Sequence, residues 1–491
     1  MATTAPQNHQ PRRILAKGTT YQLFAKGLYI LSGYLMHVFV ARYFGAALYG
    51  ILGVVLSLLL VVRLLAITGI GQTAAKFTAD NLVSSYSVFR MVSKAHWVLS
   101  LTLAAVLFVF APYIADILFH DKQLTPYIRL SAFIIPITSY LSVYLGSLNG
   151  MRLFGKHAAS TSVFGLSRLL MVIFFVLLGF GLYGVILGLI TASLLGLATA
   201  MYLYPRPNHP DGGSLSYRKM ISFAISVTIS FSSVTLISNV DLLAIKALLR
   251  DNVLAGLYTS ASTLSRIPYE FFTVFAVTVL PSVALAKSLE DLDLVKKYAR
   301  QTLRYVLILM LPCSVIISIC AERLIVIFYS QAFLMAANSL SLLVWGSSFM
   351  GLFVIMISIL NGLGKAGLSM FFASSLIPVS IFLNIFLIPR YGILGAAAAT
   401  TITAFVGLSV AFAYLALKQI VVINLKTFFR LSLGSIIMTL VLFGMSHYDH
   451  SLIGLLFIVL VSLISYFFFL LITMEFTYED YDVIKNILSR S

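Results

Sequence analysis

The sequence predicts an all-α polytopic membrane protein with about 14 transmembrane helices, arranged as two parallel six-helix lobes and two extra C-terminal helices. Three observations support this fold class. Hydrophobic residues make up 60% of the chain and charged residues only 10%, whereas a soluble protein carries about 25% charge. Apolar stretches of about 20 residues, long enough to cross a bilayer, recur along the whole chain. Several segments of the first half also recur, in the same order, in the second half.

The spanning helices follow one another with mostly short connections. We expect them at about 22–41, 46–69, 97–119, 127–148, 160–180, 182–204, 220–245, 253–280, 303–329, 337–360, 366–388, 392–417, 427–446 and 451–474. The longer connections are expected at about 70–96, 205–219 and 281–302. This organisation predicts a tail 1–14, an N-lobe 15–204, an inter-lobe linker 205–219, a C-lobe 220–417, two further helices within 418–474, and a tail 475–491.

The basic residues predict the orientation in the membrane. The chain holds 33 Lys and Arg against 16 Asp and Glu, a net charge of +17. In a soluble protein this excess would suggest nucleic acid as a partner, but here the basic residues fall in the connections on one side, with a roughly threefold bias. Lys and Arg concentrate on the cytoplasmic side of membrane proteins. We therefore expect both termini and the linker to be cytoplasmic, and no nucleic-acid partner.

Internal repeats relate the two lobes. "IGQTAAKFTAD" ends the second predicted helix and "PSVALAKSLED" the eighth, at a constant offset of 211 residues. "SLNGMRLFGKHA" matches "ILNGLGKAG", and "GLYGVILGLITASLLGLATAMY" matches "YGILGAAAATTITAFVGLSVAFAY", at offsets of 211 to 212. "ARYFGAALYG" pairs loosely with "LRDNVLAGLY". Because six is an even number of crossings, both repeats have the same orientation in the membrane. Lobes of this kind move against each other as rigid bodies and so give alternating access to a site between them.

At these residues the chain resembles a known family. "ARYFGAALYGILGVV", "GIGQTAAKFTAD" and above all "AGLYTSASTLSRIPYEFFTVFAVTVLPS" resemble the polysaccharide transporter branch of the multidrug/oligosaccharidyl-lipid/polysaccharide exporter superfamily, which includes O-antigen flippases and the stage V sporulation protein B-like group. The eighth-helix pattern also resembles the lipid II flippases. The resemblance covers about residues 15 to 420. Cavity arginines are a feature of the family, and Arg266 falls on the matching position.

The resemblance implies a flippase that moves an undecaprenyl-pyrophosphate-linked oligosaccharide from the inner to the outer leaflet of a bacterial plasma membrane. The expected partners are this lipid-linked sugar, membrane lipids, and the glycosyltransferases and polymerase of the same pathway. The resemblance implies no enzymatic activity. We expect no metal and no cofactor, other than a coupling proton or sodium ion.

Three arginines within predicted spans point to an anion-binding cavity: Arg63, Arg168 and Arg266. An arginine near the centre of a bilayer costs about 2.5–3.5 kcal/mol on insertion scales. Each of the three has a valine at the repeat-equivalent position, so the scaffold folds without the charge. Their natural partner is a diphosphate, because guanidinium binds phosphate oxygens bidentately. The alternatives are structural salt bridges for all three, and partial snorkelling to the interface for Arg63 and Arg168.

Two acidic residues are candidates for ion coupling. Glu270 lies four residues after Arg266 and shares a helix face with it, and Pro268 between them predicts a hinge. Glu270 would neutralise Arg266 until the diphosphate arrives, and would then bind a proton or cation. Asp241, near the outer end of its helix, is the second candidate. Its alternative role is an interfacial acid paired with Lys246.

Aromatic residues on several helices are candidates for a sugar path, although packing or an interfacial belt would place aromatic residues similarly. They are Tyr29, Tyr34, Tyr140, Tyr144, Tyr258 and Tyr269.

Other functions remain open on the sequence alone. The same fold could carry lipid II or a small drug, although buried arginines disfavour a cationic drug. A membrane glycosyltransferase or polymerase would need a D-x-D metal site, and Asp291 and Asp293 provide that spacing in a mixed-charge segment. A scaffold without transport would leave the buried charges unexplained.

Overall fold

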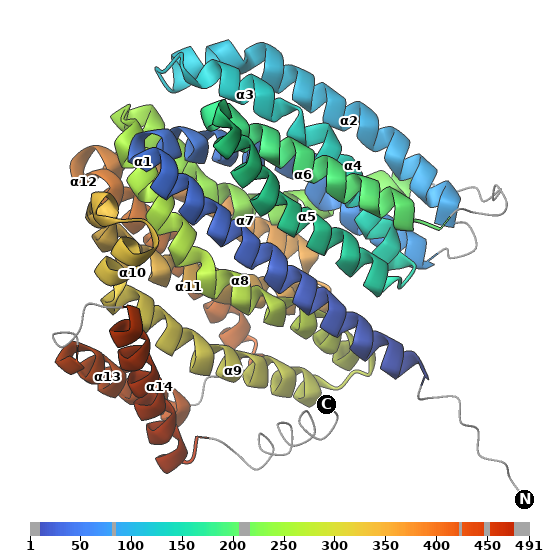
Figure 1. Ribbon diagram of the computed structural model, residues 1–491. Helices are drawn as coiled ribbons and strands as arrows, with labels where there is room; N and C mark the ends of the chain where they lie inside the picture. The colour runs from blue at the N-terminus through green and yellow to red at the C-terminus, as the bar shows by residue number, and fades with distance from the viewer. Residues whose placement is uncertain (1–9, 81–84, 206–216, 422–424, 446–451, 476–491) are drawn as a thin grey trace, which may run out of the picture. The chain divides into compact units, whose positions relative to one another are not determined.

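The structure is a computed structural model and describes residues 10–80, 85–205, 217–421, 425–445 and 452–475 (Figure 1). These residues are helical apart from short turns, which confirms the all-α class. The chain divides into two compact units, Met1–Gly256 and Leu257–Ser491.

The first unit contains all the helices of the first predicted lobe and one further helix. In order they are α1 (Gln10–Asp80), α2 (Ser85–Tyr113), η1 (Ile114–Leu118), α3 (Leu124–Ala132), α4 (Ile134–Gly150), α5 (Phe154–Phe175), η2 (Val176–Phe180), α6 (Gly181–Leu203) and α7 (Tyr217–Leu249), followed by the first residues of α8 (Asn252–Ser288). Helix α1 packs against α4, α5 and α7, and α5 packs against α6. By sequence α7 opens the second repeat, but by packing it belongs with α1.

The second unit holds the rest of α8 and the helices after it. These are α9 (Leu292–Ile319), α10 (Ala321–Phe328), η3 (Gln331–Ala336), α11 (Ala337–Gly362), α12 (Ala366–Leu417), α13 (Leu425–Met445) and α14 (Leu452–Ile472). Helix α11 packs against α9 and α12, and its small residues allow close contact. A Cβ atom on Gly346 would lie 3.0 Å from the Cα atom of Thr401 on α12. Small residues at helix crossings are typical of membrane proteins.

The helices are long and apolar enough for the predicted number of membrane crossings. The described residues contain 11 candidate spans. Three of these, Thr20–Leu64, Phe154–Leu203 and Ala366–Leu417, have 45, 50 and 52 residues. At 1.5 Å per residue each is more than twice as long as the bilayer core is thick. Counting each of the three as two crossings gives the fourteen that the sequence predicts.

Each of these long spans is interrupted by glycine in a left-handed conformation. The interruptions occur at Gly45 in α1, at Gly179 and Gly181 between α5 and α6, and at Gly392 in α12. Left-handed backbone is costly for residues with a Cβ atom. Glycine therefore lets the chain kink here without a long loop, and each long span is divided into two crossings.

The backbone reproduces the sequence repeat. Gly181 has φ 57° and ψ −139°, and Gly392, 211 residues later, has φ 58° and ψ −135°. Arg152 and Gly364, 212 residues apart, both have positive φ, and their N–H groups donate to the carbonyls of Asn149 and Asn361 at 3.0 and 2.9 Å. The same turn chemistry thus ends the matching helices of both repeats.

Two connections that the sequence predicted to be long are mostly helical. Helix α1 runs on to Asp80, so only 81–84 separate it from α2. Helix α8 runs on to Ser288, and Asp291 caps α9 by accepting a hydrogen bond from the Leu294 N–H at 2.9 Å. The polar helical turns at these ends lack the apolar pattern of a span, but helical hydrogen bonds still satisfy their backbone N–H and C=O groups. The loss of hydropathy therefore marks where the apolar run ends and not where the helix ends.

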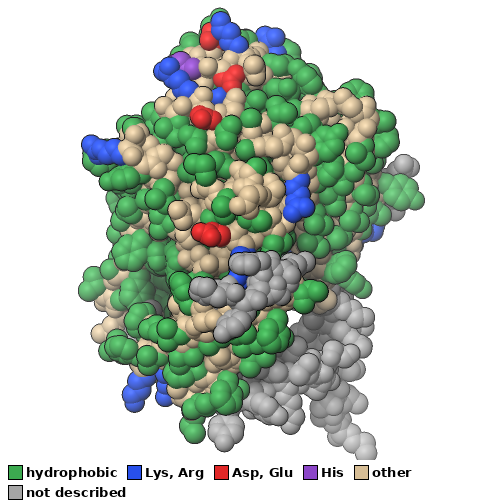
Figure 2. All heavy atoms as spheres, turned by 60° about the vertical axis from the view of Figure 1, so that its left-hand side comes forward, with side chains coloured by type: hydrophobic (Ala, Val, Ile, Leu, Met, Phe, Trp, Pro, Cys, Tyr) green, Lys and Arg blue, Asp and Glu red, His purple; other side chains and the backbone are tan. Residues whose placement is uncertain are grey.

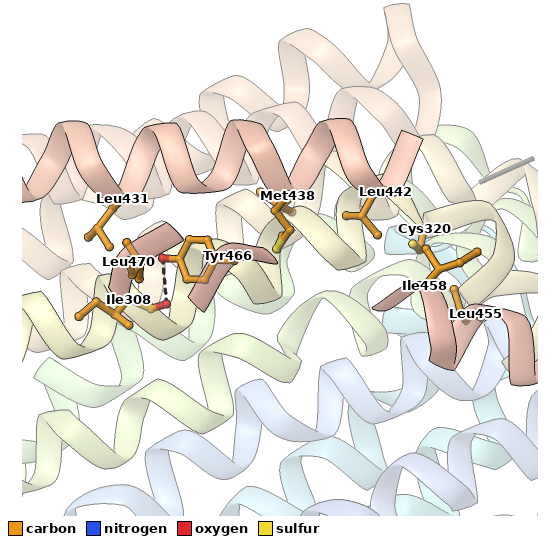
Figure 3. Packing of buried hydrophobic residues seen from close by; sticks show 10 residues of the cluster. Ile308, Cys320, Leu431, Met438, Leu442, Leu455, Ile458, Tyr466 and Leu470 are labelled. Carbon is orange, nitrogen blue, oxygen red and sulfur yellow. Dashed lines mark hydrogen bonds between the residues drawn. The ribbon is translucent and has the colours of Figure 1, made fainter. Parts of the chain in front are cut away.

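The two extra helices pack on α9 of the second unit. Figure 3 shows Leu431, Met438 and Leu442 of α13 and Leu455, Ile458, Tyr466 and Leu470 of α14 gathered around Ile308 and Cys320. The Tyr466 hydroxyl donates to the Ile308 carbonyl at 3.1 Å. At the end of α14, buried Glu475 accepts from Arg304 of α9 and Arg430 of α13, each at 3.1 Å. One carboxylate thus joins the three helices.

The surface matches a membrane environment. In Figure 2, hydrophobic side chains cover much of the visible face, and only a few charged side chains interrupt them. Large apolar residues are exposed on most helices, for example Phe24, Leu177, Phe382 and Leu471. A soluble protein rarely exposes so large an apolar area, whereas lipid covers it at no cost.

Candidate functional site: an arginine cluster in the first unit

The first unit brings two of the predicted arginines together, and a close helix crossing positions one of them. A Cβ atom on Gly165 of α5 would lie 2.9 Å from the Cα atom of Tyr29 on α1. The absence of a side chain at Gly165 therefore lets the two backbones touch, as at other small-residue crossings in membranes. Arg168 follows Gly165 by about one helical turn, so its side chain reaches across to α1.

Arg168 is fixed on Tyr29 by two contacts. Its Nη2 atom donates to the Tyr29 carbonyl at 2.7 Å, and its Cζ atom lies 4.3 Å from the centre of the Tyr29 ring. Gly33, one turn further along α1, leaves room for the guanidinium, because a Cβ atom there would lie 2.3 Å from Nη2. Phe164 of α5 also packs against Tyr29, with its ring centre 5.7 Å from that of Tyr29.

Arg63 lies on the second half of α1, close enough to interact electrostatically with both Arg168 and Tyr29. The Nε atoms of both arginines are buried and have no hydrogen-bond partner. Within the part of the chain that the structure describes, no carboxylate pairs with either guanidinium. Two like charges near one another, with unused donors and no described acid, favour an anion as their partner, and the role of this pair as a diphosphate site stays a prediction.

The third predicted arginine lies in the second unit, within α8. Arg266 and Glu270 are half-buried, and Pro268 between them is buried. Helix α8 stays helical through Pro268. Tyr269 lies within electrostatic reach of both charged groups, and the contact between Arg266 and Glu270 that the sequence predicts is allowed by their helical spacing. The roles of these residues as ligand, hinge and coupling acid stay predictions.

Asp241 lies on α7 in the first unit and is 2% exposed. Its Oδ1 atom accepts a hydrogen bond from the Leu242 N–H at 2.7 Å. The alternative role gave it Lys246 as an ion-pair partner, but the Lys246 ammonium lies on Asp121 and Asn252, at 2.8 and 2.6 Å. Its role as a coupling acid also stays a prediction.

Of the six predicted tyrosines, Tyr29 contacts the arginine cluster. Tyr140 and Tyr144 instead pack in an aromatic group with Phe89 and Tyr204, where ring centres lie 4.8 to 5.2 Å apart. Tyr258 is fully buried. For Tyr140 and Tyr144 the structure therefore favours the packing alternative.

Sequence reasoning missed Gly33 and Gly165, which shape the arginine cluster without contributing a polar atom. Each looks like one more small residue of a membrane helix, and only the crossing of α1 and α5 reveals its role. The signal that exists is spacing: Gly165 precedes Arg168 by three residues, which places both on one helix face.

Both aspartates of the D-x-D spacing make contacts within the protein. Asp291 caps α9 through its side chain. Asp293 pairs with Lys296 at 3.5 Å, and its side chain is 94% exposed. Among the described residues there is no group of three or more metal-ligating side chains. The feature that suggested a glycosyltransferase is thus a helix cap beside a surface ion pair.

Comparisons with known proteins identify the family and agree with the fold. The sequence profile of a family described as polysaccharide biosynthesis protein matches residues 39–338. Two uncharacterised membrane proteins of Methanocaldococcus jannaschii are each 24% identical to this chain, over 401 and 421 residues. The matches cover 78% and 79% of this chain, and 92% and 82% of the relatives.

Among solved structures, the lipid II flippase MurJ in an inward closed conformation matches with a TM-score of 0.71 at 15% identity. The match covers 92% of this chain and 98% of that protein. An inward-facing multidrug transporter of the MATE family, from the MOP superfamily, matches with a TM-score of 0.64 at 14% identity, covering 80% of this chain and 94% of that one. At these identities the matches show that this chain has the same fold as these transporters.

Proposed function

Since the chain belongs to the polysaccharide biosynthesis protein family, we propose that it is a flippase for a lipid-linked oligosaccharide. The substrate we propose is an undecaprenyl-pyrophosphate-linked sugar, moved from the inner to the outer leaflet of a bacterial plasma membrane by alternating access. Both termini would be cytoplasmic. The MOP transporter fold supports the transport activity, and the apolar helices support the membrane location.

The observation that carries this proposal is the pairing of Arg63 with Arg168. Two guanidinium groups, with buried unused Nε donors and no carboxylate among their described partners, favour a doubly charged anion over a cation. A diphosphate offers several oxygens at the spacing that a guanidinium fork binds. The hydrogen bond and ring contact with Tyr29 hold Arg168 in place before the anion arrives, which lowers the entropy lost on binding.

Arg266 and Glu270 would couple binding to movement. In this proposal Arg266 binds a phosphate group of the substrate, which frees Glu270 from Arg266 to take up a proton or a sodium ion. A carboxylate that loses a cationic neighbour holds a proton more tightly. The buried Asp241 is the second candidate for this role.

Lipid II is the second candidate substrate, because the solved structure with a TM-score of 0.71 is a lipid II flippase. Both substrates carry a polyprenyl diphosphate, and the arginine pair would bind either one. The sugar therefore has to be identified by experiment.

The test is a leaflet-transfer assay in proteoliposomes with labelled undecaprenyl-diphosphate-linked sugars. Transfer without any new glycan product supports a flippase, whereas product formation from added lipid-linked donors would show an enzyme. Arg63→Ala and Arg168→Ala should each strongly reduce transfer. Normal transfer by both variants would contradict the proposed anion site. Comparing lipid II with an oligosaccharide carrier in the same vesicles separates the two substrates.

A further inference from the structure

A buried network joins two turns that are far apart in the sequence. Lys246, in the last turn of α7, donates to the Oδ2 atom of Asp121 at 2.8 Å and to the Oδ1 atom of Asn252 at 2.6 Å. Asn252, the first residue of α8, donates to the same Asp121 oxygen at 2.9 Å. The Lys246 side chain is 1% exposed and that of Asp121 13%. Three residues thus satisfy one another in a closed ring.

The backbones beside this network are also in contact. A Cβ atom on Gly50 of α1 would lie 1.9 Å from the Asn252 carbonyl oxygen. A Cβ atom on Gly256 would lie 1.9 Å from the carbonyl oxygen of Ala46. The start of α8 is therefore pressed against α1 without any intervening side chain. At this end of the first unit, a close helix contact at two glycines lies beside a buried ion pair.

The network joins the first sequence repeat to the first helix pair of the second. Asp121 lies in the turn before α3, whereas Lys246 and Asn252 flank the turn between α7 and α8. If the termini are cytoplasmic, as the sequence predicts, all three residues lie on the outer side of the membrane. Lobes that alternate access must separate at this end to release substrate outward.

The charges are not part of the repeated scaffold. At the offset that matches Arg42 with Arg250, the positions equivalent to Lys246 and Asn252 are Val38 and Phe44. The first repeat therefore builds the same helix pair with apolar residues. Stability alone does not require the network, and a buried ion pair is seldom more stable than well-packed apolar residues. An ion pair differs from apolar packing because both partners are well solvated once they separate.

We propose that Asp121, Lys246 and Asn252 form an outer latch that holds the extracytoplasmic end closed and must open in each transport cycle. Opening exposes all three side chains to water together, so no charge is left buried without a partner. This inference rests on the proposed transport function, but the latch can be tested without substrate.

The first test measures a distance across the latch. The native cysteines are first replaced (Cys313→Ser and Cys320→Ala). Spin labels are then attached to Lys122→Cys and Val253→Cys, whose native side chains are 81% and 44% exposed. Pulsed electron paramagnetic resonance in detergent should give one short distance. Asp121→Asn and Lys246→Met should each add a longer one. The exchanged pair, Asp121→Lys with Lys246→Asp, should restore the short distance.

The control removes a different ion pair. Asp293→Asn breaks the exposed contact with Lys296 on α9 and should leave the distance unchanged. If Asp121→Asn or Lys246→Met misfolds, Asn252→Ala keeps the ion pair, removes both amide hydrogen bonds and should still add the longer distance. Distances unchanged in every folded latch variant would overturn the proposal.

The second test asks whether opening is needed for transport. In the variant that combines Lys122→Cys with Val253→Cys, a short reducible bis-maleimide that joins the two introduced thiols should stop sugar transfer, and reduction of the linker should restore it. Undiminished transfer by the linked protein would overturn the latch. Absence of transfer before linking would instead count against the proposed function, so the two failures can be told apart. Labelling of Lys122→Cys by an impermeant maleimide from outside the cell checks the side of the membrane.

Discussion

The Cζ atom of Arg168 lies 4.3 Å from the centre of the Tyr29 ring, and its Nη2 atom donates to the Tyr29 carbonyl at 2.7 Å. Neither contact neutralises the charge. A cation over an aromatic ring is stabilised by the ring's quadrupole and keeps its full charge. Tyr29 therefore orients Arg168 and leaves it able to bind an anion, which a salt bridge would not.

The first prediction tests this difference between orientation and neutralisation. Arg168→Ala should reduce sugar transfer at least about tenfold, because a lost charge-assisted hydrogen bond is worth about 1.5–3 kcal/mol. Arg168→Lys should recover only part of the activity, since an ammonium cannot bind two phosphate oxygens in a fork. The leaflet-transfer assay measures both. Arg390 is the matched control: its Cζ atom lies 3.7 Å from the centre of the Phe386 ring, and its side chain is exposed. Arg390→Ala should transfer normally.

The second prediction concerns Gly33, which carries no chemistry of its own. A Cβ atom at this position would lie 2.3 Å from the Arg168 Nη2 atom, so Gly33→Ala should push the guanidinium away from Tyr29 and lower transfer as Arg168→Ala does. Gly27→Ala, on the same helix, meets nothing within 4 Å and should be silent. If Gly33→Ala transports like Gly27→Ala, the position of Arg168 does not matter for activity.

The fold was largely predictable because hydropathy and repeat signals are local. Gly181 and Gly392 align at the predicted offset, and the structure gives them nearly the same backbone angles. Hydropathy separates the paired crossings but does not reveal how the chain turns between them, which a glycine with positive φ allows without a polar loop.

The candidate site was predictable only in its parts. The mid-span position of Arg63 and Arg168 marked both residues, but their proximity depends on how α1 and α5 cross at Gly165. The partner of Lys246 illustrates the same limit. Asp241, five residues away, was the sequence-based alternative, whereas the ion pair forms with Asp121, 125 residues away. The spacing of residues along the sequence identifies neighbours on one helix, but it does not reveal which residues of another helix pack against them.

The third prediction concerns the glycines that interrupt the long helical runs. Gly392→Ala forces a Cβ atom into a left-handed conformation, which costs roughly 1–2 kcal/mol. It should lower the unfolding temperature of the protein in detergent. Gly367→Ala is the control on the same helix: nothing lies within 4 Å of its Cβ position and its φ is ordinary. It should be neutral or slightly stabilising. Equal unfolding temperatures for the two variants would mean that the reversal at Gly392 tolerates a side chain.

The fourth prediction gives the pH dependence of the Asp121 network. Burial raises the pKa of Asp121, but hydrogen bonds from Lys246 and Asn252 and the Lys246 charge outweigh it, so the pKa lies below its ordinary value of 3.8. A lowered folded-state pKa stabilises the fold above the ordinary pKa, and this stabilisation is lost as the pH falls through the folded value. Asp121→Asn should therefore lower the unfolding temperature at neutral pH, and the difference should shrink on acidification below the ordinary pKa.

Charged residues close to Asp121 in the sequence provide the control for this pH profile. Asp116 and Lys122 are 3.5 Å apart and mostly exposed, and His120 in the same turn is exposed as well. Asp116→Asn should leave the unfolding temperature unchanged at every pH. A pH-independent difference between Asp121→Asn and the parent protein would mean that the carboxylate stabilises through shape and not through its charge.

The fifth prediction separates the two charged residues of α8. Arg266→Ala should fold and lose transfer if the guanidinium binds the diphosphate, and Arg266→Lys should lose most of it because the fork is gone. Glu270→Gln is close in shape but cannot ionise. If Glu270 competes with the substrate for Arg266, this variant should bind a lipid-linked sugar at least as tightly as the parent, because the competing charge is absent. Its transfer should also lose the dependence on pH or sodium, because the group that binds the coupling ion is gone. Binding and transfer measured on the same purified protein distinguish these effects. Normal transfer by Arg266→Ala, or a Glu270→Gln protein that does not fold, would instead show that the pair is a structural salt bridge which allows α8 to carry charge within the membrane.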